Sequence, residues 1–428
     1  MYWAIAVFIV KLIIISNVQG GAWLGADGEN YLQAYDALIK DGLFSTDRLL
    51  HYWPAGYPIF ILALSFVGKS FVLTTLSVIQ SLIYSFSAYF LASQISKTRF
   101  RKYSYIVFFF VLLNPTLSLS SIAVGYESLA ASGLLTSIAL IIQSLLDDSK
   151  NKLARNVILV SLISGLISFF QPRLLLSSII CIIIWLFSSL NKKLAIKYSC
   201  VALVIIFISP ISLIARNHQA NGFNAISTNL GVTMNLGAGD NATGAYIKEG
   251  YGVPCTAISG DAAAQDSHLV RCVISWYLSH PAKSIELFYN KARFFWSPWF
   301  GPEASGSMAR NPWLKINPIK EIATNSPDGN KLVYGTVGKA ISFGWILGGL
   351  FFLFFGFFAF WQAGGKERVF AAIAGIHITL NWIVAIGTLG DHRQRLPILG
   401  LSLMLQAVGI RKFLAGRKQL LVDSQSLR

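Results

Sequence analysis

Long apolar runs separated by short basic clusters constrain this sequence more than any other feature. A helix needs roughly 20 apolar residues to cross the hydrocarbon core of a membrane, where its backbone polar groups must be bonded internally. The chain is 54% hydrophobic and only 13% charged, and its mean hydropathy is +0.58. These values lie outside the range of an ordinary soluble domain. We therefore predict an all-α polytopic membrane protein.

The runs predict ten transmembrane helices, and the basic residues predict their orientation. The expected spans are 1–20, 70–96, 103–122, 128–146, 156–171, 174–190, 197–215, 336–361, 369–389 and 396–410. The clusters KTRFRK (97–102), DDSKNKLAR (147–155), NKKLAIK (191–197) and GGKER (364–368), and the tail from RKFLAGRK, then lie in the cytoplasm with both termini. The run 57–69 is short for a span, and counting it would put every cluster outside. We treat it as a juxtamembrane or re-entrant helix.

Three regions follow from this topology. Residues 1–215 form an N-terminal transmembrane module with a first outer segment at 21–56, residues 216–335 form an outer loop region, and residues 336–428 form a C-terminal transmembrane module with a basic tail. The outer parts face the periplasm or exterior of a plasma (inner) membrane. Because the basic residues serve as membrane anchors, the net charge of +16 does not indicate nucleic acid as a partner.

The long outer loop contains two expected helices. One runs from 261 to 279 behind the cap residue Ser259, and the other begins at Pro281. The second helix and the residues after it carry an aromatic band that we expect in the membrane interface. This band comprises Phe288, Phe294, Phe295, Trp296 and Trp299.

The four cysteines fall into two pairs. Cys255 and Cys272 lie in the outer loop, where an oxidising compartment permits a disulfide; two free thiols are the alternative. Cys181 and Cys200 lie inside spans, and we expect packed thiols there. Their spacing does not suggest zinc.

Carboxylates cluster in the first outer segment, within GADGENYLQAYD at 25–36. The pattern between 31 and 39 predicts a short amphipathic helix that Gly42 can end, with Asp27 at its N-terminus. An isolated aspartate at that position acts as a helix cap. Glu127, however, has no charged neighbour and stands at the outer end of the third or fourth predicted span. A lone acid at membrane depth is a functional candidate by default.

Basic residues also stand at the outer ends of spans, against the positive-inside bias. They are Arg173, Arg216, His392, Arg393 and Arg395. Arginine binds phosphate oxygens through paired donors, so a phosphate-bearing ligand would account for these positions. Pairing with Asp391, Glu127 or lipid headgroups is the alternative. Lys11 lies in the middle of a span and is either a buried structural partner or part of a site.

Several stretches, spread over most of the chain, occur in an order that suggests a family. They are Asp27-x-x-x-Tyr31-x-x-Ala34, PAGYPIFILALSFVGKS, LNP…YES ending at Glu127 and Ser128, ARN…GFNAISTNLGVTMNLGAGDNATGAY, HPAKSIELFYNKARFFWSPWFGP and RQRLPILGLSL. In this order the chain resembles the bacterial polyprenyl-phosphate-sugar-dependent glycosyltransferases of the GT-C superfamily. It is similar to the membrane mannosyltransferases and the lipid A aminoarabinose transferases.

The resemblance implies a sugar donor on polyprenyl phosphate and transfer with inversion to a glycan, lipid or protein acceptor. The reaction would occur in a cavity between the membrane lipids and the outer loops. Asp27 matches the first-loop aspartate that serves as catalytic base or, in some branches, as part of a divalent metal site. Glu127 matches the acidic residue of the second outer loop. Many members have a second acid directly after the aspartate, where this chain has Gly28; Glu29 is the nearest replacement, so metal binding stays open.

The chemistry of such a transfer needs a carboxylate near the acceptor hydroxyl and cations near the departing phosphate. We assign the base to Asp27 and the phosphate contacts to the outer arginines, with further first-loop residues as candidates for the phosphate, the sugar or the acceptor. These further candidates are Arg48, His51, Tyr31, Trp53 and Tyr57. A glycan polymerase or ligase with a lipid diphosphate donor is one alternative. A transporter is another, although repeated halves with broken helices are not evident.

Overall fold

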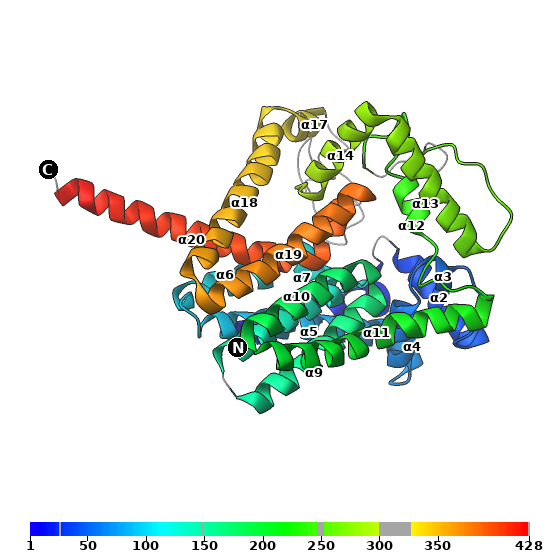
Figure 1. The fold of residues 1–428 in the computed structure, drawn as a ribbon. Helices are drawn as coiled ribbons and strands as arrows, with labels where there is room; N and C mark the ends of the chain where they lie inside the picture. The colour runs from blue at the N-terminus through cyan, green and yellow to red at the C-terminus, as the bar shows by residue number, and fades with distance from the viewer. Residues whose placement is uncertain (25–26, 148, 246–251, 299–326, 427–428) are drawn as a thin grey trace.

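The computed structural model describes residues 1–24, 27–147, 149–245, 252–298 and 327–426. Within these residues, eight helical stretches are long and apolar enough to cross a membrane. They are built on α5 (Val72–Ile95), α8 (Glu127–Leu146), α9 (Lys150–Phe170), α10 (Leu175–Ser189), α11 (Lys192–Asn221), α18 (Thr336–Ala363), α19 (Gly365–Gly387) and α20 (Leu396–Ser426). Helices α9, α10 and α11 lie side by side, and α18 packs on both α19 and α20 (Figure 1). The chain is an all-α polytopic membrane protein, as the sequence predicts.

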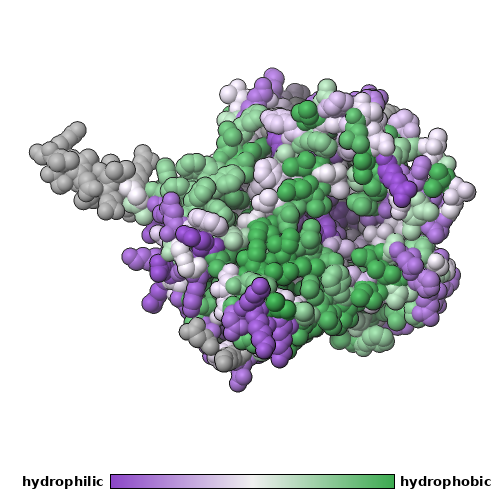
Figure 2. All heavy atoms as spheres, viewed as in Figure 1, coloured by the Kyte–Doolittle hydropathy of each residue, from purple (hydrophilic) through white to green (hydrophobic). Residues whose placement is uncertain are grey.

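The two ends of the helix bundle differ in character. Four helices that are not among these eight lie at one end, opposite the C-terminus, and we call this the loop end (Figure 1). They are α2 (Gly28–Asp41), α3 (Leu49–Tyr52), α12 (Leu230–Asn235) and α13 (Ala262–Ser279). The turns that carry the basic clusters lie at the other end, the basic end. Figure 2 shows apolar side chains over the middle of the bundle and hydrophilic residues gathered toward its ends.

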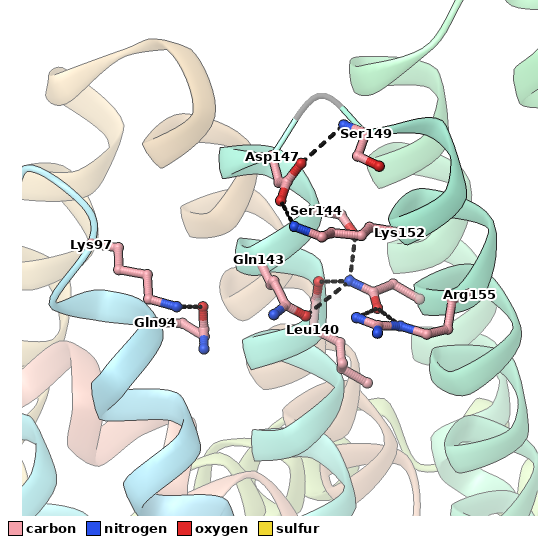
Figure 3. Close-up of polar contacts among 10 residues, drawn as sticks. Gln94, Lys97, Leu140, Gln143, Ser144, Asp147, Ser149, Lys152 and Arg155 are labelled. Carbon is pink, nitrogen blue, oxygen red and sulfur yellow. Dashed lines mark hydrogen bonds and ion pairs between the residues drawn. The ribbon is translucent and has the colours of Figure 1, made fainter.

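Polar contacts fix the turn between α8 and α9 at the basic end (Figure 3). Asp147 accepts a hydrogen bond from Ser149 N at 3.0 Å and pairs with Lys152 Nζ at 2.6 Å. In the helices below this turn, Asn156 Nδ2 donates to Ser144 Oγ at 2.9 Å. Asn156 is buried, so this bond satisfies a polar group within the apolar bundle.

Two of the ten predicted spans differ from the long helices. The first, 1–20, forms α1 (Tyr2–Ser16), a helix of 15 residues that packs against α5. Lys11 is buried there: its Nζ donates to Ser121 Oγ at 3.0 Å and lies 4.5 Å from the ring centroid of Tyr84. These contacts with Ser121 and Tyr84 favour the structural role for Lys11 over a role in a site.

The second, 103–122, is broken into α6 (Ser104–Leu112) and α7 (Pro115–Ser120). A proline lacks the N–H that a continuous helix needs, and it disfavours helical backbone in the residue before it. Asn114 accordingly has extended backbone, with φ −60° and ψ 115°, and its side chain caps α7 by accepting a backbone N–H at 3.1 Å. The dipeptide Asn-Pro thus replaces one long span with two short helices.

The run 57–69 forms α4 (Gly56–Ser65), an apolar helix of 10 residues, followed by η2 (Lys69–Phe71). Gly56 allows α4 to approach α9 closely, because a Cβ at this position would lie 2.0 Å from Phe169 O. The prediction of a short helix rather than an eleventh span at this run therefore agrees with the described helix.

The first segment at the loop end begins with a short parallel pairing that sequence patterns did not indicate. Strand β1 (Trp23–Leu24) pairs with β2 (Ala123–Val124), with Trp23 opposite Ala123. This pairing places Leu24 opposite Val124, a short distance in sequence before Asp27 and Glu127. Helix α2 follows and ends as predicted, since Gly42 has φ 81° and donates its N–H to Leu38 O at 3.0 Å.

The second segment forms α13 and α14 (Pro281–Phe295), which confirms both expected helices. The cap of α13 is Asp261, not Ser259: the Asp261 carboxylate accepts the N–H of Ala264 at 2.8 Å. Cys255 and Cys272 are joined in a disulfide that ties the preceding chain to α13.

The structure corrects the expected surroundings of three side chains, those of Phe295, Trp296 and Cys200. Phe295 and Trp296 are buried in the core rather than exposed in an interfacial band, because they pack against α19 and neighbouring helices. Trp299 lies outside the described residues. Cys181 is buried as expected, whereas Cys200 is exposed on α11.

The remaining elements of the described residues are η1 (Gln19–Gly21), η3 (Arg101–Tyr103), η4 (Pro172–Leu174), α17 (Pro327–Tyr334) and η6 (His392–Arg395).

Candidate active site

An ion-pair cluster at the loop end joins three distant parts of the chain. Arg393 Nη1 lies 2.5 Å from Asp27 Oδ2, and Arg393 Nε lies 2.6 Å from Glu127 Oε1. The side chains of Asp27, Glu127 and Arg393 keep 17%, 10% and 21% of their exposure. The structure therefore brings together the two acids and one of the arginines that sequence analysis singled out.

Local structure explains how these acids meet. Asp27 stands at the N-cap position of α2, but its side chain makes no capping hydrogen bond and turns to Arg393 instead. Glu127 is the first residue of α8, where the helix dipole favours a negative charge. The pairing of β1 with β2 precedes both acids in sequence and holds their segments together. Arg393 comes from η6, whose cap Asp391 accepts the N–H of Arg393 at 2.8 Å.

Tyrosine rings form a buried wall beside the carboxylates. The Tyr31 ring centroid lies 5.0 Å from that of Tyr57 and 6.3 Å from that of Tyr126. Tyr57 Oη accepts the N–H of Gly125 at 2.8 Å, and Tyr126 Oη accepts from Gln171 Nε2 at 2.7 Å. Burial, reinforced by Tyr126, raises the pKa of Tyr31 well above its usual value, so this phenol is neutral. Sequence analysis chose Tyr31 and Tyr57 but missed Tyr126 and Gln171.

Two further arginines, the partly buried Arg173 and the buried Arg395, form no ion pair with a carboxylate among the described residues. Arg173 Nη2 donates to Gln394 O at 3.1 Å, while its Nε has no hydrogen-bond partner there. Arg395 Nη2 lies 3.4 Å from Ser297 O, and its Nε is likewise unpartnered. Buried donors that lack a partner are costly, so the Nε groups of these two arginines favour an anion as their ligand.

His392 shares this region. Its Nδ1 lies 2.9 Å from Ser297 O and 3.1 Å from Arg395 Nη2, and its buried Nε2 has no partner among the described residues. The Arg395 guanidinium also lies over the ring of Trp296, 5.3 Å from its centroid. Trp296 and Ser297 directly follow α14, so the end of this helix contributes to this group of donors and acceptors. Neither residue was assigned to a site from the sequence.

Arg216, by contrast, holds the first loop segment and is not part of the cluster. Its Nε donates to Leu43 O at 3.0 Å, Nη1 donates to Leu50 O at 3.1 Å, and Nη2 donates to Ser45 O. Each nitrogen of the Arg216 guanidinium therefore donates to a backbone carbonyl. The structure therefore places Arg216 in a structural clasp instead of the predicted phosphate contact.

His51 strengthens the same clasp. Its Nδ1 lies 3.1 Å from Thr228 Oγ1, and Thr228 N donates to His51 O at 2.9 Å. Burial, with Arg216 nearby, lowers the pKa of His51, so the ring stays neutral. Arg48 is exposed over the ring of Tyr52, and Glu29 is exposed in the first turn of α2. Trp53 packs against Tyr31, with ring centroids 6.0 Å apart.

Lys291 of α14 links α13 to the turn before η6, and sequence analysis did not select it. It is fully buried on α14, and its Nζ donates to Tyr277 Oη at 2.6 Å and to Thr388 O at 2.7 Å. Burial lowers the pKa of Lys291 to about 7. Pro281 predicts where α14 begins but does not reveal that one lysine on this helix is buried.

A metal site is not formed by these side chains. Among the residues that the structure describes, no three side chains of His, Cys, Asp or Glu are grouped to hold a metal ion. The space between the two acids of the cluster is taken by the Arg393 guanidinium.

Comparisons with known proteins give limited guidance. No protein-family model and no curated protein matches the chain. Among solved structures, the chain is similar to the archaeal oligosaccharyltransferase AglB from Archaeoglobus fulgidus, solved with an inhibitory peptide and a dolichol-phosphate. The alignment covers 99% of this chain and 52% of that one, with 11% identity and a TM-score of 0.45. The chain thus spans about half the length of that protein. A TM-score this low does not establish a shared fold, so function must be argued from the site.

Proposed function

We propose that the protein is an integral-membrane glycosyltransferase. It moves a sugar from a polyprenyl-phosphate carrier to an acceptor hydroxyl, with inversion, on the outer face of the membrane. The carrying observation is the cluster of Asp27, Glu127 and Arg393, together with the partly buried Arg173 and the buried Arg395, which form no ion pair with a carboxylate among the described residues. The acids and arginines lie at one end of a membrane-spanning helix bundle, where they could bind a phosphate ester carried on a membrane lipid.

The reaction can be written with these side chains. Asp27 accepts the proton of the acceptor hydroxyl as its oxygen attacks the anomeric carbon of the sugar. The bond from that carbon to the phosphate oxygen breaks, and its electron pair leaves with the polyprenyl phosphate. Arg173 and Arg395 bind the phosphate oxygens, where charge develops in the transition state. Glu127 and Arg393 hold Asp27 in place.

The proposed orientation follows from the two ends of the bundle. The turns that carry basic clusters lie opposite α2, α3 and the site, which supports a cytoplasmic basic end and an external loop end. The division into regions 1–215, 216–335 and 336–428 fits this arrangement. Residues from the first and third regions supply the acids and Arg393, and Ser297 of the second contacts Arg395 and His392.

Proteoliposomes containing the purified chain test this proposal. They are supplied with sugars on polyprenyl phosphate or on polyprenyl diphosphate, and the release of free carrier lipid is measured. We expect release of polyprenyl phosphate only from the monophosphate donor when an acceptor is present. Release from the diphosphate donor alone would favour a glycan polymerase or ligase. Movement of intact donor across the bilayer without cleavage would favour a transporter. Either result would overturn the proposal.

A second test addresses the phosphate contacts. Arg173→Gln removes a partly buried guanidinium and is expected to reduce transfer by about 100-fold, the usual cost of losing one donor to a developing charge. Arg155→Gln, an exposed arginine of α9 at the basic end, is the matched control and should retain wild-type transfer. Equal transfer by the two variants would remove Arg173 from the proposed site.

A further inference from the structure

The two acids of the cluster share one positive charge that the protein itself supplies. Arg393 donates from Nη1 to Asp27 and from Nε to Glu127, across 366 and 266 positions of sequence. All three side chains are largely withdrawn from solvent. In such surroundings two carboxylates repel each other strongly unless a cation lies between them. The guanidinium provides that cation permanently, because it does not lose its proton in proteins.

A divalent metal ion does not fit the residues present. Mg²⁺ prefers six oxygen ligands at about 2.0–2.1 Å, and it usually takes one or two carboxylates together with substrate phosphate and water. Here one oxygen of each carboxylate, Asp27 Oδ2 and Glu127 Oε1, contacts the guanidinium at 2.5 and 2.6 Å, and that positive charge would repel a second cation between the two acids. The nearest additional acid in sequence, Glu29, is exposed in the first turn of α2.

The turn that presents Arg393 is held from several sides. Asp391 accepts the N–H of Arg393 at 2.8 Å, and Gly390 N donates to Gly244 O at 2.9 Å. Just before this turn, Lys291 Nζ donates to Thr388 O at 2.7 Å. These hydrogen bonds hold the backbone that carries Arg393, so the fold itself fixes the position of the guanidinium beside the two carboxylates.

We propose that Arg393 is the resident counter-ion of the Asp27 and Glu127 pair, in the place of a divalent metal, and that sugar transfer at this site needs no such metal. The second half of this statement rests on the proposed function; the first half does not. The two carboxylates use two of the five N–H donors of the guanidinium. The same cation thus has donors for the departing phosphate, a task that a bound metal would otherwise perform.

Metal binding tests the counter-ion independently of activity. The purified full-length chain, freed of metal with a chelator, is titrated with Mn²⁺, and free Mn²⁺ is followed by electron paramagnetic resonance. We expect the wild-type chain and Asp27→Asn to give the same titration curve. A stoichiometric Mn²⁺ site in the wild-type chain that Asp27→Asn abolishes would overturn the proposal.

Transfer by the reconstituted chain tests the second half. We expect the same rate with and without EDTA, a loss of about 100-fold in Arg393→Met, and partial recovery in Arg393→Lys, which keeps a cation but not the forked donors. Arg411→Met, an exposed arginine of α20, is the control and should match the wild type. Transfer abolished by EDTA and restored by Mg²⁺ would overturn the proposal. If the untreated chain uses no donor, the proposed function fails, and the Mn²⁺ titration still decides the counter-ion.

Discussion

The Arg216 clasp makes a prediction that separates a structural arginine from a substrate-binding one. Arg216→Met keeps most of the aliphatic stem but removes the donors to Leu43 O, Ser45 O and Leu50 O. A buried carbonyl left without its donor costs about 1–3 kcal/mol. The bonds to Ser45 O and Leu50 O are buried and that to Leu43 O is part-buried, so two such groups destabilise the folded chain by roughly 2 kcal/mol at the low end of that range. We expect a lower midpoint of thermal unfolding, followed by intrinsic tryptophan fluorescence in detergent.

The matched control is Arg48→Met, which lies in the same segment but is exposed. Exposed substitutions of this kind usually change stability by less than about 0.5 kcal/mol. At a temperature where Arg216→Met is folded, its KM for the lipid donor should equal that of the wild type. An unchanged unfolding midpoint together with a raised KM would refute the reasoning and return Arg216 to the phosphate site.

Three other predictions concern the loop end. Cys255→Ser should lower the unfolding midpoint by an amount equivalent to about 3 kcal/mol for a moderate loop, and reduction of the wild-type disulfide should have the same effect. Because burial lowers the pKa of Lys291 from 10.5 to about 7, the unfolded chain binds a proton that the folded chain rejects, and stability falls as pH drops from 10 to 7. Lys291→Met should flatten that dependence in unfolding midpoints measured across this range; an unchanged slope would contradict it. Gly56→Ala should destabilise the chain, because its Cβ would lie 2.0 Å from Phe169 O, and a wild-type midpoint would show that α4 and α9 can separate freely.

Local signals in the sequence identified much of the fold. Gly42 does end α2, and Pro281 does begin α14, because these residues act on their own backbone. The break between α6 and α7 is also local: the Asn-Pro dipeptide at 114–115 signals it, but the apolar run around it suggested one continuous span. Hydropathy alone therefore predicted one span over 103–122 where the structure has two short helices.

The site was only partly accessible because its contacts join distant segments. Composition and topology selected Asp27, Glu127 and Arg393, but the two-residue pairing of β1 with β2 that brings the acids together has no pattern of its own. Position at the end of a predicted span also does not distinguish Arg216 from Arg173. Arg216 donates to backbone carbonyls, whereas Arg173 has an Nε with no partner among the described residues. Such differences depend on which groups fold against each arginine.

The central claim is that Asp27 accepts the proton of the acceptor during sugar transfer, and one comparison tests it most directly. Asp27→Asn keeps the size of the side chain but cannot act as the base, and Asp36→Asn is the matched control on the exposed face of α2. Both are reconstituted after size-exclusion chromatography shows that they are folded, and transfer from polyprenyl-phosphate sugar is measured. We predict a loss of at least about 100-fold in Asp27→Asn and wild-type transfer in Asp36→Asn. Near wild-type transfer by folded Asp27→Asn would contradict the account.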